Sequence, residues 1–149
     1  MSERTFVMIK PDGVGRRLIG DCVQRLEKRG LKLVAVKMRI LSREMAERHY
    51  GEHEGKPYYE PLLTFITSGP VVLMVWEGVD AIAQVRKMIG ATNAFQADTG
   101  TIRSDWAMSN RYNLVHASDA QDTARREMDI YFDEHELVTY SMPDEHWLK

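Results

Sequence analysis

Asn113-Leu-Val-His116-Ala-Ser-Asp119 is the stretch from which both the fold and the site of this chain can be approached. Three positions that suit a buried strand lead into a histidine, and small polar residues typical of a helix start follow at once. Ser118 and Gln121 fit a Ser-x-x-Gln capping box, and Asp119 would favour the positive end of the helix dipole. We therefore predict that His116 ends a buried strand directly before a helix N-terminus, a place that favours an incoming anion.

The composition is that of an ordinary globular protein, with 44% hydrophobic and 28% charged residues. A length of 149 residues suits one domain over 1–149. The formal net charge of −2 argues against a dedicated nucleic-acid coat. The single cysteine, Cys22, rules out an internal disulfide and favours a reducing compartment, so we expect a cytoplasmic protein. No apolar run approaches the ~20 residues of a membrane span, and no signal-peptide pattern opens the chain.

Hydrophobic periodicity divides the chain into alternating strands and helices. Strands are predicted over 5–9, 31–40, 71–76 and 113–116. Helices are predicted over 18–29, 42–50, 58–67 and 80–89 and after the histidine. Residues 90–104 show no useful period and are interpreted as a long ordered loop, a type of loop that is usually functional. This order predicts an α+β fold, a ferredoxin-like βαββαβ sandwich whose four-stranded, mainly antiparallel sheet carries its helices on one face.

Two of the predicted helices have a stripe of apolar residues that we expect to face the core. In the helix over 58–67 the stripe consists of Tyr58, Leu62, Phe65 and Ile66. In the helix after the histidine it consists of Ala124, Met128, Tyr131 and Phe132.

Three local patterns resemble known binding motifs but lack their defining features. The glycines at 13, 15 and 20 miss the dinucleotide fingerprint, and the segment 51–57 misses a P-loop by one residue and by its final Ser or Thr. His49 and His53 have the i, i+4 spacing of two zinc ligands. Gly51 lies between them and no third ligand follows at a diagnostic spacing, so the sequence disfavours zinc at this pair.

Five polar side chains at the ends of elements suggest an anion site near the histidine. They are Lys10, Arg86, Thr92, Arg103 and Asn113. Each alone is more often a solvated surface residue. Together they offer three cations and two neutral hydrogen-bonding groups that could face the helix start after the histidine.

The sequence resembles the nucleoside diphosphate kinase family, and the resemblance covers almost the whole chain. It rests on seven motifs in the right order: 5–13 (TFVMIKPDG), 49–50 (HY), 55–57 (GKP), 67–72 (TSGPVV), 90–93 (GATN), 100–103 (GTIR) and 113–119 (NLVHASD). Several such matches in order make the signal very specific.

The resemblance implies transfer of the γ-phosphoryl group of ATP or another nucleoside triphosphate to a nucleoside diphosphate by a ping-pong mechanism. His116 matches the family's phosphorylated nucleophile. An imidazole suits this chemistry, because its unperturbed pKa of about 6.5 leaves a neutral nitrogen lone pair at physiological pH. Glu127 matches the carboxylate that accepts a hydrogen bond from the other ring nitrogen and fixes the tautomer.

The resemblance also assigns the remaining residues of a nucleotide site. Phosphate contacts fall on Lys10, Arg86, Thr92 and Arg103, with Lys10 also reaching the ribose. A ribose contact falls on Asn113, the sandwich around the base on Tyr58 and Leu62, and the tyrosine close to the histidine is Tyr50. Mg²⁺ would arrive with the nucleotide phosphates, with Asp119 at most a ligand through water. Stacking without readout of the base edge would give low base selectivity.

The family forms homo-oligomers, either hexamers or tetramers, and needs neither a membrane nor a nucleic acid. In the long loop, Ala94 and Thr99 stand where prolines are frequent, a change that could loosen the assembly. Two other classes of protein are alternatives to an active kinase. A regulatory member that binds nucleic acid or protein would be expected to lose His116, Lys10 or Arg103, and all three remain. A purely structural module would not need the cations.

Overall fold

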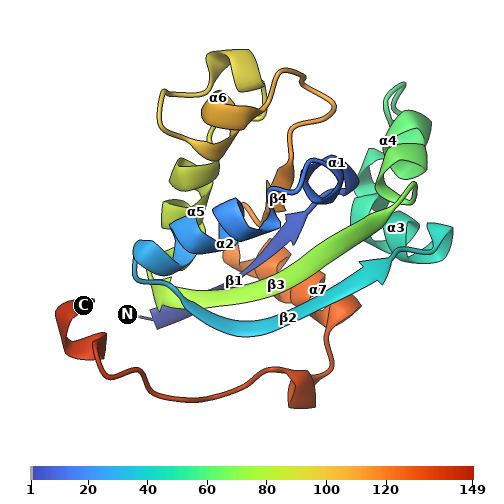
Figure 1. Ribbon diagram of the computed structural model, residues 1–149. Coiled ribbons are helices and arrows are strands. Elements are labelled where there is room, and N and C mark those ends of the chain that lie inside the picture. Colours follow the sequence, from blue (N-terminus) through green and yellow to red (C-terminus); the bar gives the residue numbers. More distant parts are fainter. Residues whose placement is uncertain (1) are drawn as a thin grey trace.

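The computed structural model describes residues 2–149, in which four strands form one sheet (Figure 1). The strands are β1 (Ser2–Ile9), β2 (Lys32–Ile40), β3 (Pro70–Val79) and β4 (Val115–Ala117). Their order across the sheet is β2-β3-β1-β4, and each neighbouring pair is antiparallel. The predicted α+β fold with a four-stranded antiparallel sheet is therefore confirmed.

The helices connect these strands and cover them (Figure 1). They are α1 (Pro11–Gly15), α2 (Ile19–Lys28), α3 (Arg43–Tyr50), α4 (Tyr59–Ile66), α5 (Ala81–Ile89), α6 (Ile102–Trp106) and α7 (Gln121–Tyr131). Single 3₁₀ turns lie at Gly51–His53, Ala94–Gln96, Glu134–Glu136 and Glu145–Trp147. The sequence predicts only a turn where α1 lies and a long loop that includes α6, because five residues are too few for a helical period to show.

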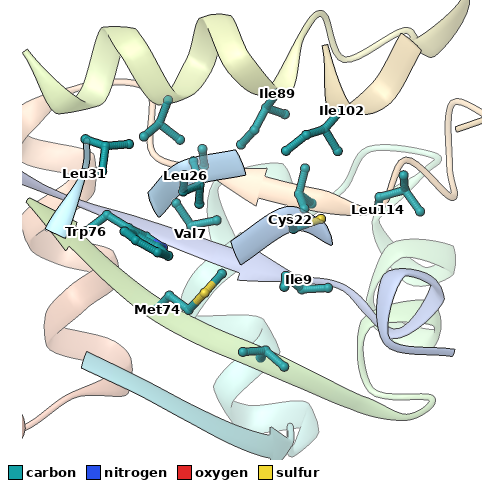
Figure 2. Close-up of a cluster of buried hydrophobic side chains, with 14 of the residues drawn as sticks. Val7, Ile9, Cys22, Leu26, Leu31, Met74, Trp76, Ile89, Ile102 and Leu114 are labelled. Atoms are coloured by element: carbon teal, nitrogen blue, oxygen red, sulfur yellow. The ribbon is translucent and has the colours of Figure 1, made fainter. Parts of the chain in front are cut away.

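Helices lie on both faces of the sheet, so the expectation that they share one face is wrong. One cluster packs α2, α5 and α6 on the side of Val7 and Ile9 (Figure 2), and another packs α3, α4 and α7 on the side of Phe6 and Met8. All four of these β1 residues are at most 1% exposed. A strand that is apolar at every position must be covered twice, which the continuous apolar runs at 5–9 and 71–76 indicated.

The buried stripe of α4 agrees with the prediction at Ile66 but is shifted by one position at the two earlier residues. Tyr59, Leu63 and Ile66 face the core, whereas Tyr58 is 47% exposed and Leu62 is partly buried. The helix has apolar residues on two sides, one against the core and one along a cleft. Spacing alone could not distinguish these two sides.

The capping box predicted at the start of α7 is also wrong. The N-cap is Ala120, and α7 begins at Gln121. Ser118 remains beside β1, where its N–H donates to the carbonyl of Phe6 at 3.1 Å. Its hydroxyl donates at 2.6 Å to Glu127, which lies on the second turn of the helix. The serine therefore serves a buried carboxylate rather than the helix end.

The segment after α7 returns along β2 and covers only the first half of that edge strand. The N–H of Val138 donates to the carbonyl of Val34 at 3.0 Å, and the hydroxyl of Tyr140 donates to the carbonyl of Leu33. The second half keeps an exposed apolar row, formed by Val36 (54% exposed), Met38 (50%) and Ile40 (70%).

Within residues 2–149, no helix combines the length and apolar character needed to cross a membrane. The thiol of Cys22 is free and buried in the α2 side of the core (Figure 2), and burial raises its pKa to about 12. It therefore behaves as a small core residue rather than as a reactive thiolate.

Gly13 is required by the close approach of α1 to β1 and to the segment before β4. A Cβ atom there would lie 2.7 Å from Cγ2 of Ile9 and 2.9 Å from the carbonyl oxygen of Leu114, whereas Gly15 in the same helix has open space. We expect Gly13→Ala to lower the free energy of unfolding by about 1–3 kcal/mol through overpacking. The matched change Gly15→Ala should not lower it, because the site is open and alanine is favoured over glycine in a helix by up to about 1 kcal/mol. Urea unfolding measures both, and equal effects would contradict this packing argument.

Candidate active site

A cleft of about 580 Å³ opens between α4 and the end of β4, and it contains all the residues predicted for the site. The predicted residues that line it are Lys10, Tyr50, Tyr58, Leu62, Arg86, Thr92, Arg103, Asn113, His116, Asp119 and Glu127. They come from six helices or strands and the loops between them, and only folding brings them together. The volume lies in the range of about 300–1,000 Å³ typical of small-molecule sites.

His116 lies in the middle of β4, where it pairs with Met8 of β1. Its Nε2 is 3.0 Å from both carboxylate oxygens of Glu127. An ionised carboxylate can only accept, so Nε2 carries the ring proton and Nδ1 keeps its lone pair. Within residues 2–149 no group hydrogen-bonds to Nδ1, and the side chain is 21% exposed in the cleft. The imidazole therefore presents a nucleophilic nitrogen from a rigid strand.

Glu127 projects from α7 and is 2% exposed. Besides His116, it accepts hydrogen bonds from the hydroxyl of Ser118 at 2.6 Å and from Nε2 of His49 at 3.0 Å. Burial by itself would raise the pKa of this carboxyl, but the bonds from His116 and His49 outweigh it and hold the pKa well below its usual range. The carboxylate is therefore ionised at neutral pH and fixes the orientation of the imidazole.

His49 is a site residue that the sequence analysis did not assign. It lies on the last turn of α3, 2% exposed, with its Nδ1 2.7 Å from the hydroxyl of Tyr131. Its ring stacks on Tyr50 with centroids 4.1 Å apart. Burial lowers the pKa of His49 to about 4 despite the hydrogen bond to Glu127, so its contact with that carboxylate is a hydrogen bond from a neutral ring. One signal was available, since a histidine three residues after the buried Ala46 lies on the inner face of the helix.

Arg103 is held by backbone carbonyl groups rather than by a carboxylate. Its guanidinium donates to the carbonyl oxygens of Gly90 at 3.0 Å, Asn113 at 3.2 Å and Val115 at 2.6 Å. The side chain is buried at the start of α6, which Thr101 caps by accepting from the N–H of Ser104. Neutral acceptors fix the guanidinium in place and leave its charge intact.

Lys10 and Arg86 are also held by neutral acceptors rather than by carboxylates. The ammonium group of Lys10 donates to Oδ1 of Asn113 at 2.8 Å, and Arg86 donates to the carbonyl of Ala117 at 3.1 Å. In the described part of the chain, neither these two residues nor Arg103 takes part in a salt bridge. Within residues 2–149, three positive charges therefore share one wall of the cleft without a salt-bridge partner, and the carboxylate of Asp12 offsets only part of the charge of Lys10 and Arg103.

The electrostatic cost of this arrangement appears in the pKa values. Burial, with a smaller contribution from Arg103, lowers the pKa of Lys10 to about 8. Burial and the charge of Arg86 lower the pKa of Arg103 to about 10. An anion bound between these groups would relieve the repulsion, so the cleft is organised to receive one.

The backbone before β4 is held in an unfavourable conformation that shapes this wall. Leu114 is fully buried and has a φ of +76°, in the left-handed region that non-glycine residues rarely adopt. Its N–H donates to Oδ2 of Asp12 at 3.0 Å, and its carbonyl accepts from the N–H of Lys10 at 2.8 Å. Such conformations are typical of functional sites, and here the two bonds hold Asn113 beside Lys10.

The far end of the cleft is lined by Tyr58 and Leu62 and by polar residues that the sequence analysis did not assign. The hydroxyl of Tyr58 lies 2.7 Å from Nδ1 of His53. Asn110 and Arg111 also line the cleft. They belong to a loop without periodicity, so no pattern in the sequence marked them. A planar, partly apolar group would fit against the tyrosine ring at this end.

Together these groups can perform a defined kind of chemistry. One cleft contains a nucleophilic nitrogen, an aromatic side chain, and three cations that form no salt bridge within residues 2–149. This arrangement suits covalent transfer of an anionic group from a phosphorylated compound that also carries a planar ring.

Comparison with known proteins agrees with this geometry. The sequence model of the family described as "Nucleoside diphosphate kinase" matches residues 3–137. The nucleoside diphosphate kinase of Carboxydothermus hydrogenoformans is 53% identical over 98% of this chain and 98% of its own length. That of Archaeoglobus fulgidus is 52% identical over 98% of this chain and 97% of its own length.

Two solved structures are similar over nearly the whole chain. A halophilic nucleoside diphosphate kinase from Halobacterium salinarum in complex with CDP has a TM-score of 0.96 at 51% identity, covering 99% of this chain and 98% of that one. A transition-state mimic of the Borrelia burgdorferi enzyme with bound vanadate and ADP has a TM-score of 0.94 at 38% identity, covering 99% and 96%. On sequence and on structure, this chain belongs to the nucleoside diphosphate kinase family.

Proposed function

We propose that this chain is an active nucleoside diphosphate kinase, which transfers the γ-phosphoryl group of a nucleoside triphosphate, mainly ATP, to a nucleoside or deoxynucleoside diphosphate. One observation carries the proposal. Nδ1 of His116 keeps its lone pair in a cleft that also holds three cations with no salt-bridge partner within residues 2–149. The activity would balance nucleotide pools by making CTP, GTP, UTP and deoxynucleoside triphosphates.

The transfer proceeds in two half-reactions at one nitrogen. Nδ1 of His116 attacks the γ-phosphorus, the bond from that phosphorus to the β–γ bridging oxygen breaks, and the diphosphate leaves with the bond electrons. The ring retains the proton on Nε2, and the carboxylate of Glu127 stabilises the positive charge that the ring gains. A second diphosphate then attacks the phosphohistidine through a terminal oxygen and restores the free imidazole.

The wall of the cleft supplies most of the positioning. Lys10, Arg86, Arg103 and Thr92 would hold the phosphates, and Asn113 would contact the ribose. Tyr58 and Leu62 would hold the base, whose face rather than edge they would contact. The hydroxyl of Tyr50 lines the cleft, is buried and has no hydrogen-bond partner among residues 2–149, so a phosphate oxygen would satisfy it. The Halobacterium salinarum relative was solved in complex with CDP, which supports a nucleotide as the ligand of this chain.

Mg²⁺ fits this site as a companion of the nucleotide. It prefers oxygen ligands and is usually held by one or two carboxylates together with substrate phosphates. Asp119 lines the cleft and is exposed, which suits contact through water. When bound, the ion would neutralise charge on the phosphates, while the orientation of the nucleophile comes from Glu127.

We also propose that the chain forms a homo-oligomer, a hexamer or a tetramer, and works in the cytoplasm, where its substrates are. The exposed apolar row on the edge strand β2 supports association, because an uncovered edge with apolar side chains readily pairs with another chain. The nucleotide chemistry is not tied to this proposal, since every assigned group comes from one chain.

The kinase proposal is tested with γ-labelled ATP and Mg²⁺ in the absence of acceptor. We expect acid-labile, base-stable label on the wild-type protein that leaves on addition of GDP, CDP or UDP. His116→Ala should carry no label, whereas His146→Ala, which alters an exposed histidine near the C-terminus, should be labelled normally. Folded wild-type protein without label would overturn the proposal and favour a binding protein of the same family.

The lowered pKa of Lys10 predicts a pH dependence of nucleotide binding. Bound phosphate favours the charged ammonium, so above the free-protein pKa of about 8 binding must take up a proton. The affinity for ADP should therefore fall by up to about tenfold per pH unit as pH rises beyond that value. Calorimetric titration across this range should show the decline in the wild type and a weaker, flatter profile in Lys10→Met. The same slope in both proteins would show that another group titrates.

Oligomerisation through the β2 edge is tested by Met38→Glu, which puts a charge in the centre of the exposed row. We expect the variant to lose subunits, as light scattering after size exclusion would show, because burying an unpaired carboxylate is costly. Val79→Glu is the control, since Val79 is similarly exposed (43% against 50%) at the end of β3. A monomeric wild type, or an unchanged mass in Met38→Glu, would contradict the proposed interface.

A further inference from the structure

The innermost part of the cleft brings together three side chains that are suited to bind a transition metal. His49 from α3, His116 from β4 and Glu127 from α7 each offer one ligand atom, and these atoms all lie within 4.8 Å of one another. We propose that they form a site for a divalent metal of the zinc class, and that the bound metal blocks phosphoryl transfer. The site stands on its geometry, whereas the block rests on the proposed function.

The spacing of the ligand atoms already matches a tetrahedral ion. The two Nε2 atoms are 3.3 Å apart, and each lies 3.0 Å from the carboxylate of Glu127. Zinc bonds of about 2.0–2.1 Å in tetrahedral geometry place neighbouring ligand atoms about 3.3 Å apart. An ion could therefore take up these three ligands with little movement of the side chains.

The rings also point in a suitable direction. The ring centroids of His49 and His116 are 4.7 Å apart, whereas their Nε2 atoms are separated by only 3.3 Å. The nitrogen tips therefore converge, with the ring planes at 78° to each other. Two donors that converge in this way can share one ion, which a stacked pair of imidazoles could not do.

The chemistry of the set selects the kind of metal. Two imidazoles and one carboxylate are a ligand set of zinc sites that keep a fourth position open. Mg²⁺ prefers oxygen ligands, so the nucleotide-borne ion would not compete for this place. The outer contacts needed for orientation are present, with Tyr131 on Nδ1 of His49 at 2.7 Å and Ser118 on Glu127 at 2.6 Å.

An entry path exists even though two of the ligands are buried. All three line the cleft, and the side chain of His116 is 21% exposed there. The fourth position would therefore open toward the cleft, where water or a phosphate oxygen could occupy it. His53 is not part of the set, so the partners of His49 are distant in sequence, 67 and 78 residues away.

Inhibition follows from the tautomer of His116. In the metal-free site Nε2 carries the proton and Nδ1 has the lone pair that would attack phosphorus. A metal on Nε2 uses the lone pair of that atom, so the proton of the neutral ring must move to Nδ1. The nitrogen that faces the cleft then has no lone pair to offer. A metal on Nε2 therefore blocks attack of Nδ1 on phosphorus.

Metal binding is tested on the full chain with Co²⁺, whose visible absorption reports tetrahedral nitrogen and oxygen ligands, followed by displacement with Zn²⁺. We expect one ion per wild-type chain. Loss of an outer contact alone lowers metal affinity by about 10–100-fold, so His49→Gln, which removes a ligand, should lower it by at least about 100-fold. Circular dichroism and thermal unfolding would confirm that this variant is folded.

The matched control removes the three other histidines. They are His53, His135 and His146. The triple variant His53→Gln/His135→Gln/His146→Gln should bind Co²⁺ and Zn²⁺ as the wild type does. The proposed site would be overturned if the wild type bound no ion, or if the triple variant lost binding while His49→Gln kept it.

The proposed inhibition of phosphoryl transfer by the bound metal is tested separately. Protein loaded with one equivalent of Zn²⁺ and freed of excess is exposed to γ-labelled ATP and Mg²⁺, and we expect at least tenfold slower labelling that a chelator restores. Binding of Zn²⁺ without slower labelling would overturn the inhibition and leave the site standing. Absence of label in the metal-free protein would instead overturn the proposed kinase, and the Co²⁺ spectrum would still decide the metal site.

Discussion

The hydrogen bond from Nε2 of His116 to Glu127 is the interaction on which the rest of the cleft depends. It joins β4 to α7 and determines which ring nitrogen has a free lone pair. A carboxylate that is 2% exposed is costly to bury, and two imidazoles and the hydroxyl of Ser118 offset that cost. Neutral donors suit this task, because a protonated His49 would place another positive charge beside the nucleophile. The lowered pKa of His49 shows that the buried ring remains neutral.

The second constraint is the positive charge in the cleft that contains the histidine. Arg103, Arg86 and Lys10 are held by backbone carbonyls and by the amide of Asn113, which position them without cancelling their charge. Carboxylate partners would have neutralised these buried cations, but they would also have competed with the phosphates of a ligand. The cost of this arrangement in the ligand-free protein is that the ammonium of Lys10 is destabilised, which lowers its pKa to about 8. Preorganised charge of this kind is the main contribution a protein can make to phosphoryl transfer.

The sequence allowed the strands, the longer helices and the cluster of site residues to be predicted, because each leaves a local mark. Apolar runs mark β1 and β3, and polar residues at element ends mark Lys10 and Arg103. Features that depend on contacts between distant segments were missed. Ser118 was interpreted as a helix cap, although its partner lies nine residues away across the start of α7. In the sequence, His49 pairs by its spacing with His53 as a possible zinc ligand, whereas in the structure its neighbours are His116 and Glu127. The helices proved to cover both faces of the sheet, which continuous apolar strands already implied.

The most direct test of this account is the tautomer of His116, which long-range ¹H–¹⁵N correlation spectroscopy can determine in metal-free protein labelled at histidine. The account predicts a protonated Nε2 and a Nδ1 with the chemical shift of an unprotonated nitrogen at neutral pH, with Glu127→Gln weakening that preference. A proton on Nδ1 in the wild-type protein would contradict it, because the ring nitrogen that is not bound to Glu127 could not then act as the nucleophile.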